Sequence, residues 1–184
     1  MKRPQRLFRI GVTGLILAVG LGSVGCTPKI PAKVGIEELN LYHEWLKHYF
    51  GSKAPTQLYL DDQTFIYDPL DPKRGQALPK GSAVPSSLAR QLHALGNAEY
   101  PVEVASVGMN LPWPYQVLNP RVLPAPATGL HIISFSRVGF NRSLTEALFA
   151  ISDSCGGECG HGGPVHAVKQ NGAWQFTELA GWVY

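Results

Sequence analysis

The sequence predicts a single domain of the α+β class, with an antiparallel sheet of four to six strands packed by an N-terminal helix and a second short helix. Three observations support this prediction. Residues 36–50 have the spacing of an amphipathic helix, residues 130–179 hold several strand-like segments, and Asn171-Gly172 separates the last two of these segments. A chain of 184 residues is long enough for one domain of common size.

Residues 36–50 are expected to form the N-terminal helix. Apolar side chains recur there at every third or fourth position, at Ile36, Leu39, Tyr42, Leu46 and Tyr49. Glutamates near the start of the segment and Lys47 and His48 near its end suit the helix dipole, and Gly51 provides a stop.

The middle of the chain holds shorter elements. Residues 57–67 are predicted to form a strand with a turn or bulge at its centre. A second short helix is predicted over residues 88–95, with a serine just before it as the cap, and residues 101–107 can form a short strand.

The C-terminal part carries the clearest strand pattern. Strands are predicted over residues 130–137, 146–153, 164–170 and 173–179, with a turn at 139–143. Asn171-Gly172 predicts a tight hairpin because both residues tolerate positive φ. The helix at 36–50 is expected to cover the apolar face of these strands.

The first 25 residues have the pattern of a secretory signal peptide. Four cationic residues stand in the first nine positions, and residues 10–24 are apolar and uncharged. This apolar run is shorter than the ~20 residues that a helix needs to span a bilayer. The chain is therefore divided into a signal peptide (1–25), a tether (26–35) and one α+β domain (36–184).

Ser23-Val24-Gly25-Cys26 resembles the bacterial lipobox, in which small residues precede a cysteine that becomes acylated. Ser23 stands where members of that class usually carry leucine. The resemblance implies a palmitate-bearing lipid on Cys26 and a place in the bacterial cell envelope, with the membrane as a partner. Thr27 resembles the sorting pattern for the outer membrane, facing the periplasm, in a Gram-negative cell. There are two alternatives. An ordinary signal peptidase could cleave the chain and leave Cys26 as a free thiol, or the segment could remain uncleaved as an anchor.

The positive charge of the chain belongs mainly to this targeting segment. The formal net charge is +3, but without the first nine residues 12 basic side chains face 13 acidic ones. A near-neutral domain without a basic stripe argues against nucleic acid as a partner.

Cys155 and Cys159 remain if Cys26 is acylated, and an exported protein reaches an oxidising compartment. A disulfide between them, within a glycine-rich loop, is the preferred interpretation. A zinc site is the alternative, because Cys155, Cys159, His161 and His166 are four ligands within twelve residues, although their spacing is not that of a familiar finger. Free redox-active thiols are a third possibility. No cofactor is expected.

Motifs of the common hydrolases are missing from the sequence. There is no G-x-S-x-G elbow, no S-x-x-K and no phosphate-binding glycine loop followed by Lys-Ser or Lys-Thr. An enzyme hypothesis remains for the loop at 155–163, and it requires His161 or His166 to face a pocket beside a carboxylate. Arg137 is expected to be structural, paired with backbone carbonyls or with a carboxylate such as Asp153 or Glu146.

Three segments together carry a resemblance. They are SFSRVGFN at 134–141, C-G-x-x-C-G at 155–160 and N-G-x-W at 171–174. Over residues 130–175 the chain resembles a group of uncharacterised secreted bacterial proteins that share these segments. The resemblance implies secretion and brings no catalytic residue.

The sequence thus favours a non-catalytic lipoprotein that acts as a binding or envelope-interaction module. Its partner would be an envelope protein or a small ligand. Trp113 and Tyr115, in a proline-rich stretch, form a candidate binding patch, unless they fold back over the edge of the core.

Overall fold

The computed structural model describes residues 34–71, 77–95, 99, 102, 111–118, 124–125, 128–155 and 159–183. The predicted signal peptide, Cys26 and nearly all of the tether lie outside these residues, and so does most of the strand predicted at 101–107.

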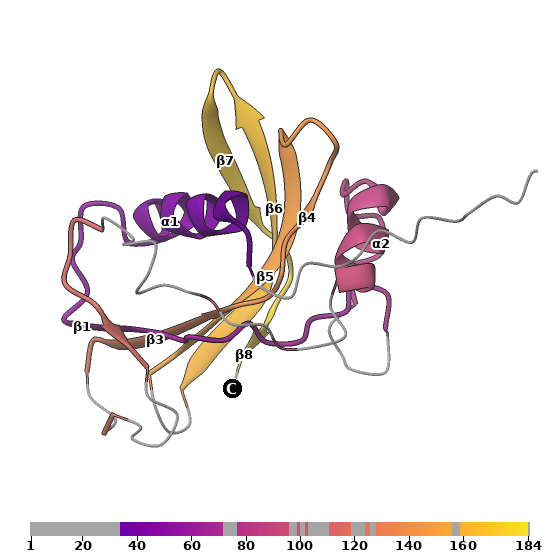
Figure 1. Cartoon of the computed structure of the whole chain (residues 1–184). Coiled ribbons are helices and arrows are strands. Elements are labelled where there is room, and N and C mark those ends of the chain that lie inside the picture. The colour runs from indigo at the N-terminus through magenta and orange to yellow at the C-terminus, as the bar shows by residue number, and fades with distance from the viewer. Residues whose placement is uncertain are drawn as a thin grey trace, which may run out of the picture.

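The described residues form two helices and one sheet of eight strands (Figure 1). The helices are α1 (Ile36–Phe50) and α2 (Ser86–Leu95). The strands are β1 (Gln57–Leu60), β2 (Gln116–Val117), β3 (Leu130–Phe135), β4 (Gly139–Phe140), β5 (Glu146–Ser154), β6 (Gly160–Gln170), β7 (Ala173–Glu178) and β8 (Trp182–Val183). Their order is β2-β1-β3-β5-β6-β7, with β4 paired to β5 and β8 paired to β6.

The predicted α+β class is confirmed, but the prediction of a purely antiparallel sheet of four to six strands is wrong. Strands β3, β5, β6 and β7 are antiparallel, whereas β1 runs parallel to both β2 and β3. Hairpin turns enforce antiparallel pairing, but the connection from β1 to β3 is long and contains α2, so the chain can return in the same direction.

Several element boundaries also differ from the prediction. Strand β1 ends at Leu60, where the Asp61 side chain accepts a hydrogen bond from the Gln63 amide, and Phe65 makes only an isolated bridge to Ser136. The turn predicted at 139–143 begins later, because Gly139–Phe140 pair with β5 as β4.

Helix α1 has the predicted bounds. Gly51, with φ of 56°, ends the helix and donates its amide to the Lys47 carbonyl. Tyr42 and Trp45 are fully buried against the sheet, and the Tyr42 ring stacks on Phe135 with centroids 4.2 Å apart. Burial of these aromatic rings fixes α1 on one face of the sheet.

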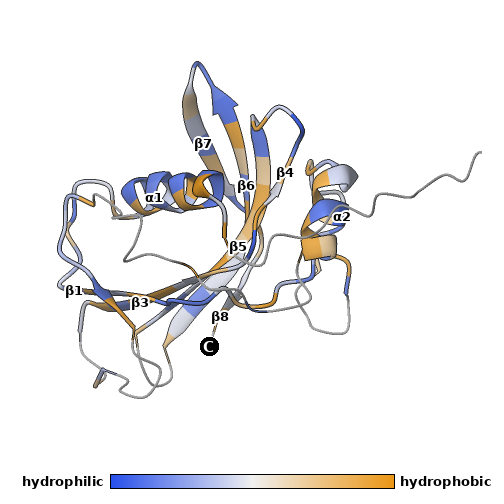
Figure 2. Ribbon diagram, in the orientation of Figure 1, coloured by the Kyte–Doolittle hydropathy of each residue, from blue (hydrophilic) through white to orange (hydrophobic). Residues whose placement is uncertain are grey.

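Both faces of the sheet are covered. Alternate residues of β5 enter two different cores: Ala147, Phe149 and Ile151 pack with α1, and Leu148 and Ala150 pack with α2. Figure 2 shows hydrophobic residues along β5 and where the helices face the strands, and hydrophilic residues at the tip of the β6–β7 hairpin. The sheet is therefore the middle layer between the two helices.

The predicted hairpin between β6 and β7 is confirmed. Asn171 and Gly172 have φ of 52° and 85°, as a tight turn of this kind requires. The strand before the hairpin is longer than predicted, since β6 begins at Gly160 and not at Pro164. The glycine-rich segment at 160–163 is therefore strand, and this places His161 opposite Asp153 of β5.

Candidate functional site

Three strands bring polar side chains to one end of the sheet face that α1 covers. His161 on β6 lies directly opposite Asp153 on β5, and Asp153 also lies opposite Ile133 on β3. His131 stands two residues before Ile133, so its side chain projects from the same face. His131, Asp153 and His161 are thus neighbours although they lie far apart in the sequence.

Tyr49, in the last turn of α1, joins these three residues into one hydrogen-bonded cluster. Its hydroxyl lies 2.7 Å from Asp153 Oδ2 and 3.1 Å from His161 Nε2. His131 Nδ1 lies 2.8 Å from the same Asp153 oxygen. We call Tyr49, His131, Asp153 and His161 the His–Asp cluster.

The donor and acceptor capacities of the four groups indicate where the protons lie. The ionised Asp153 carboxylate only accepts hydrogen bonds, so His131 carries a proton on Nδ1 and Tyr49 donates its hydroxyl proton. The Tyr49 oxygen must then accept from His161, which carries a proton on Nε2. His131 Nε2 and His161 Nδ1 have no hydrogen-bond partner within the part of the chain that the structure describes.

Burial differs across the cluster. Asp153 is 4% exposed, whereas 30% of the His131 side chain is accessible. The pKa of the Tyr49 phenol is raised well above its usual value, first by burial, then by its hydrogen bond to Asp153 and by the charges of Asp153 and Glu178. Tyr49 therefore remains a neutral donor at physiological pH.

A cavity of about 390 Å³ adjoins the cluster. All four cluster residues line it, together with Cys155, Gly160 and Val183. Ligand pockets of proteins typically measure roughly 300–1,000 Å³. The cavity is thus of a size that admits a small molecule beside the two histidines.

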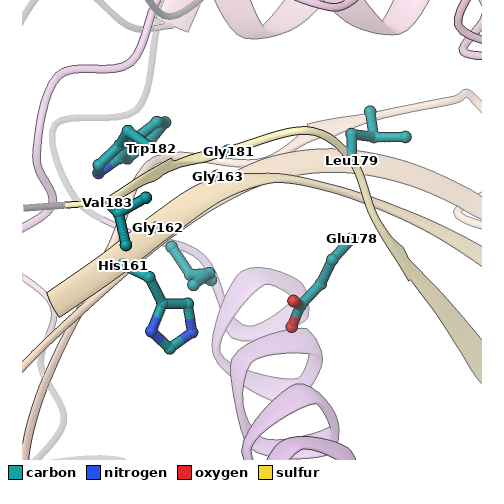
Figure 3. A pocket seen from close by; sticks show the side chains of 9 residues that line it. His161, Gly162, Gly163, Glu178, Leu179, Gly181, Trp182 and Val183 are labelled. Atoms are coloured by element: carbon teal, nitrogen blue, oxygen red, sulfur yellow. The ribbon is translucent and has the colours of Figure 1, made fainter.

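A second cavity of about 250 Å³ shares His161 and Val183 with the first. Figure 3 shows His161 and Glu178 projecting from the strands to the side on which α1 lies, whereas Trp182 and Leu179 project to the opposite side. His161 therefore stands at the junction of the two cavities.

A β-bulge adjoins the second cavity. Val165 pairs with Glu178, and Gly162 pairs with Trp182, so the two β6 residues between these pairs lie opposite three residues of the β7–β8 segment. Pro164 lies at this point, where it has no amide hydrogen to give to the β7–β8 edge.

Glycines allow the two backbones to approach closely at the bulge. A Cβ on Gly181 would collide with the Gly162 carbonyl, and a Cβ on Gly162 would lie 2.5 Å from the Ile151 carbonyl oxygen and 2.7 Å from the Trp182 ring. These glycines bring β8, and with it Val183, back beside His161.

The cysteines predicted to pair are placed together. Cys155 and Cys159 lie at disulfide-bond distance, with Cα atoms 5.7 Å apart, which is compatible with the predicted disulfide. They close the connection between β5 and β6, directly after the last ladder pair, Ser154 and Gly160. Cys155 also lines the larger cavity.

The alternative zinc ligands are not brought together. His166 stands five positions after His161 on β6, an odd separation that places the two side chains on opposite faces of the sheet. His166 Nε2 instead lies 2.9 Å from Glu146 Oε1. Among the described residues, no group of three or more His, Cys, Asp or Glu side chains is placed to hold a metal ion.

Trp113 and Tyr115 lie at the edge of the core. Trp113 is 8% exposed and its ring meets the edge of Phe50, with centroids 5.5 Å apart. Tyr115 is partly buried and packs against the same core. Trp113 therefore offers little surface to a partner, whereas Tyr115 stays partly exposed.

Arg137 is structural, as predicted, but its carboxylate partner is Glu38 and neither Asp153 nor Glu146. Arg137 Nε and Nη2 donate to the two Glu38 oxygens at 2.8 and 3.0 Å. Glu38 also accepts hydrogen bonds from the Gly35 and Val138 amides. Asp153 and Glu146 are engaged elsewhere, with His131 and His166.

The sequence alone did not identify three members of this cluster as site residues: Tyr49, His131 and Asp153. A usable signal exists in the strands: His131 and Asp153 are polar residues near the ends of otherwise apolar segments, LHIISF and EALFAISDS. Such residues project from the core face of a strand, where a polar side chain needs a partner.

In comparisons with known proteins, no family model, no curated protein and no solved structure matches this chain.

Within the described residues, neither helix has the length and apolar character that crossing a bilayer requires.

Proposed function

We propose that this chain is an exported protein, anchored to the bacterial cell envelope through a lipid on Cys26, that binds a small polar ligand at the His–Asp cluster. The N-terminal pattern supports the export and the anchor. The cysteine pair at disulfide-bond distance is compatible with an oxidising compartment. The observation that carries the binding proposal is the meeting of four hydrogen-bonding side chains at one cavity.

The cluster has the properties of a prepared binding site. Its members hold one another through three hydrogen bonds of 2.7 to 3.1 Å, so their positions are set before a ligand arrives. Each histidine keeps one ring nitrogen that no described residue engages, and this nitrogen can accept a hydrogen bond from a ligand. In pockets of this size, a small number of well-placed polar groups usually orients the ligand.

An enzyme is the second candidate function, and a specific observation favours it. The enzyme hypothesis for residues 155–163 requires a histidine to face a pocket beside a carboxylate. His161 lines a cavity together with Asp153, and Tyr49 links the two side chains.

The anchor is tested by the intact mass of the protein extracted from membranes, measured with and without reductant. We expect a chain that begins at Cys26 and carries acyl groups, and a gain of two hydrogens on reduction. The Cys26→Ser variant, the matched control, should lose the acyl mass and leave the membrane fraction. A mass equal to the unprocessed chain would contradict export.

The binding site is tested by NMR of the histidine side chains during titration with a panel of small neutral esters, amides and alcohols. We expect at least one probe to shift the His131 and His161 signals while the His93 signals stay constant. His93 is a suitable internal reference, because it is exposed and paired with Asp68. Shifts confined to His93, or none, would contradict the proposed site.

A further inference from the structure

We propose that the His–Asp cluster is catalytic, and that His131 acts as a general base that activates water for hydrolysis of a small uncharged carboxylic ester. This inference rests on the proposed function, since it requires the cavity to admit a small ligand. It goes further by naming a reaction, a substrate class and the residue that moves the proton.

The first support is the orientation of His131. Asp153 accepts a hydrogen bond from His131 Nδ1 at 2.8 Å, so the ring nitrogen left to act as a base is Nε2. The imidazole ring also lies edge-on to Phe50, with centroids 5.0 Å apart, which limits its rotation. A buried carboxylate that fixes the histidine tautomer and stabilises the imidazolium is the arrangement used for general bases.

The second support is the way Asp153 is held. Tyr49 donates to the same Oδ2 atom as His131, and the Tyr49 oxygen in turn accepts from His161. Tyr49 and Asp153 are therefore positioning residues. Only His131 would contact the reacting water.

The charges around the cavities point to the substrate class. Asp153 and Glu178 are the carboxylates among the described lining residues, and neither lysine nor arginine lies among them. A phosphate or a carboxylate would meet like charge there, and the described lining residues supply no lysine or arginine to offset it. A neutral ester avoids this repulsion, and the second cavity offers the apolar side chains of Ile151 and Val183 to an alkyl or acyl group.

The reaction balances without a cofactor. His131 Nε2 removes a proton from water as the water oxygen forms a bond to the carbonyl carbon. The tetrahedral intermediate collapses with cleavage of the bond between that carbon and the alcohol oxygen. The proton on Nε2 then passes to the leaving alkoxide, which gives one carboxylic acid and one alcohol and restores neutral His131.

The test is hydrolysis of p-nitrophenyl acetate and p-nitrophenyl butyrate by the membrane-extracted protein, compared with matched variants. His131→Gln should lower kcat/KM by about 10²- to 10⁴-fold, the usual contribution of a general base. His93→Gln should leave kcat/KM unchanged, because the His93–Asp68 pair has similar geometry, 2.9 Å, on an exposed surface. Thermal melts verify that each variant is folded.

Asp153→Asn separates a positioning role from a structural one. Asp153→Asn should lower kcat while KM stays close to the wild-type value, because the ester still enters the cavity but His131 loses the carboxylate that orients it. A merely structural role would instead lower the melting temperature and change KM as well.

Three outcomes would overturn the inference. They are equal rates for wild type and His131→Gln, no hydrolysis of either ester above the buffer rate, and preferential cleavage of bis(p-nitrophenyl) phosphate. If neutral probes shift the His131 and His161 NMR signals but no ester is cleaved, the catalytic inference fails and the binding proposal stands. If neither occurs, both fail.

Discussion

The hydroxyl of Tyr49 and the carboxylate of Asp153, 2.7 Å apart, connect the last turn of α1 to the central strand β5. The two residues are 104 positions apart in the sequence. Through this contact the end of the helix completes a site whose other members all come from the sheet.

Removing the Tyr49 hydroxyl should destabilise the protein. Tyr49→Phe deletes two hydrogen bonds, one of them to a charged group, and leaves Asp153 with one donor fewer. We expect a loss of about 1.5–3 kcal/mol in the free energy of unfolding, measured by urea denaturation. Tyr59→Phe is the control, because the Tyr59 hydroxyl has no hydrogen bond to a described residue, and it should change stability little. Equal effects of the two substitutions would contradict the role of Tyr49.

Loss of one partner of the buried Glu38–Arg137 ion pair should strongly lower the stability of the protein. Both side chains are less than a tenth exposed, so Glu38→Gln leaves a buried guanidinium without its counter-charge. We expect a cost of about 3–5 kcal/mol in urea denaturation. The double variant Glu38→Gln/Arg137→Met should recover part of this loss, because no unpaired charge remains. A double variant less stable than Glu38→Gln would argue against the charge as the cause.

Gly181→Ala should disturb the bulge between β7 and β8. The added Cβ would collide with the Gly162 carbonyl, and backbone atoms of a paired strand move only at a cost. We expect a loss of about 1–3 kcal/mol and a shift of the His161 NMR signals. Gly35→Ala is the matched control, since its Cβ would lie 3.7 Å from the nearest neighbouring atom, an ordinary contact. Normal stability of Gly181→Ala would show that β8 does not stay paired to β6.

Alkaline pH should unfold the protein through its buried tyrosines. Burial is the largest cause that raises the pKa of Tyr42, Tyr49 and Tyr67 above the usual value of about 10. Their contribution to stability is complete below the pKa of the unfolded state and is lost as pH rises above it, because the unfolded chain releases protons that the folded one retains. Tyrosinate absorbance and circular dichroism should therefore change together above about pH 10. Tyr49→Phe should weaken this dependence on pH.

Local patterns predicted most of the helices and hairpins. The bounds of α1 and the turn at Asn171-Gly172 follow from side-chain spacing and turn chemistry within a few residues. The parallel pairing of β1 with β3 could not be predicted this way, because it depends on the path of a connection that brings Gln57 opposite Leu130.

The candidate site could be predicted only in part. His161 draws attention because it stands in a conspicuous glycine-rich segment, but the glycines favour a loop there, with a strand beginning only at Pro164. The structure makes this segment a strand, because a bulge accommodates the proline and the neighbouring glycines permit close backbone contact. His131 reaches the site through the register of β3, and Tyr49 reaches it through the packing of α1. Neither feature can be read from the order of residues in the sequence.

Helix α1 is fastened at both ends: Glu38 in its first turn binds Arg137, and Tyr49 in its last turn binds Asp153. The two attachment points are about 16 Å apart along the helix axis. The proposed lipid tether enters the domain just before this helix, so tension from the membrane would reach the Glu38–Arg137 pair first. The ion pair would then bear such a load before the hydrogen bonds around Asp153 do.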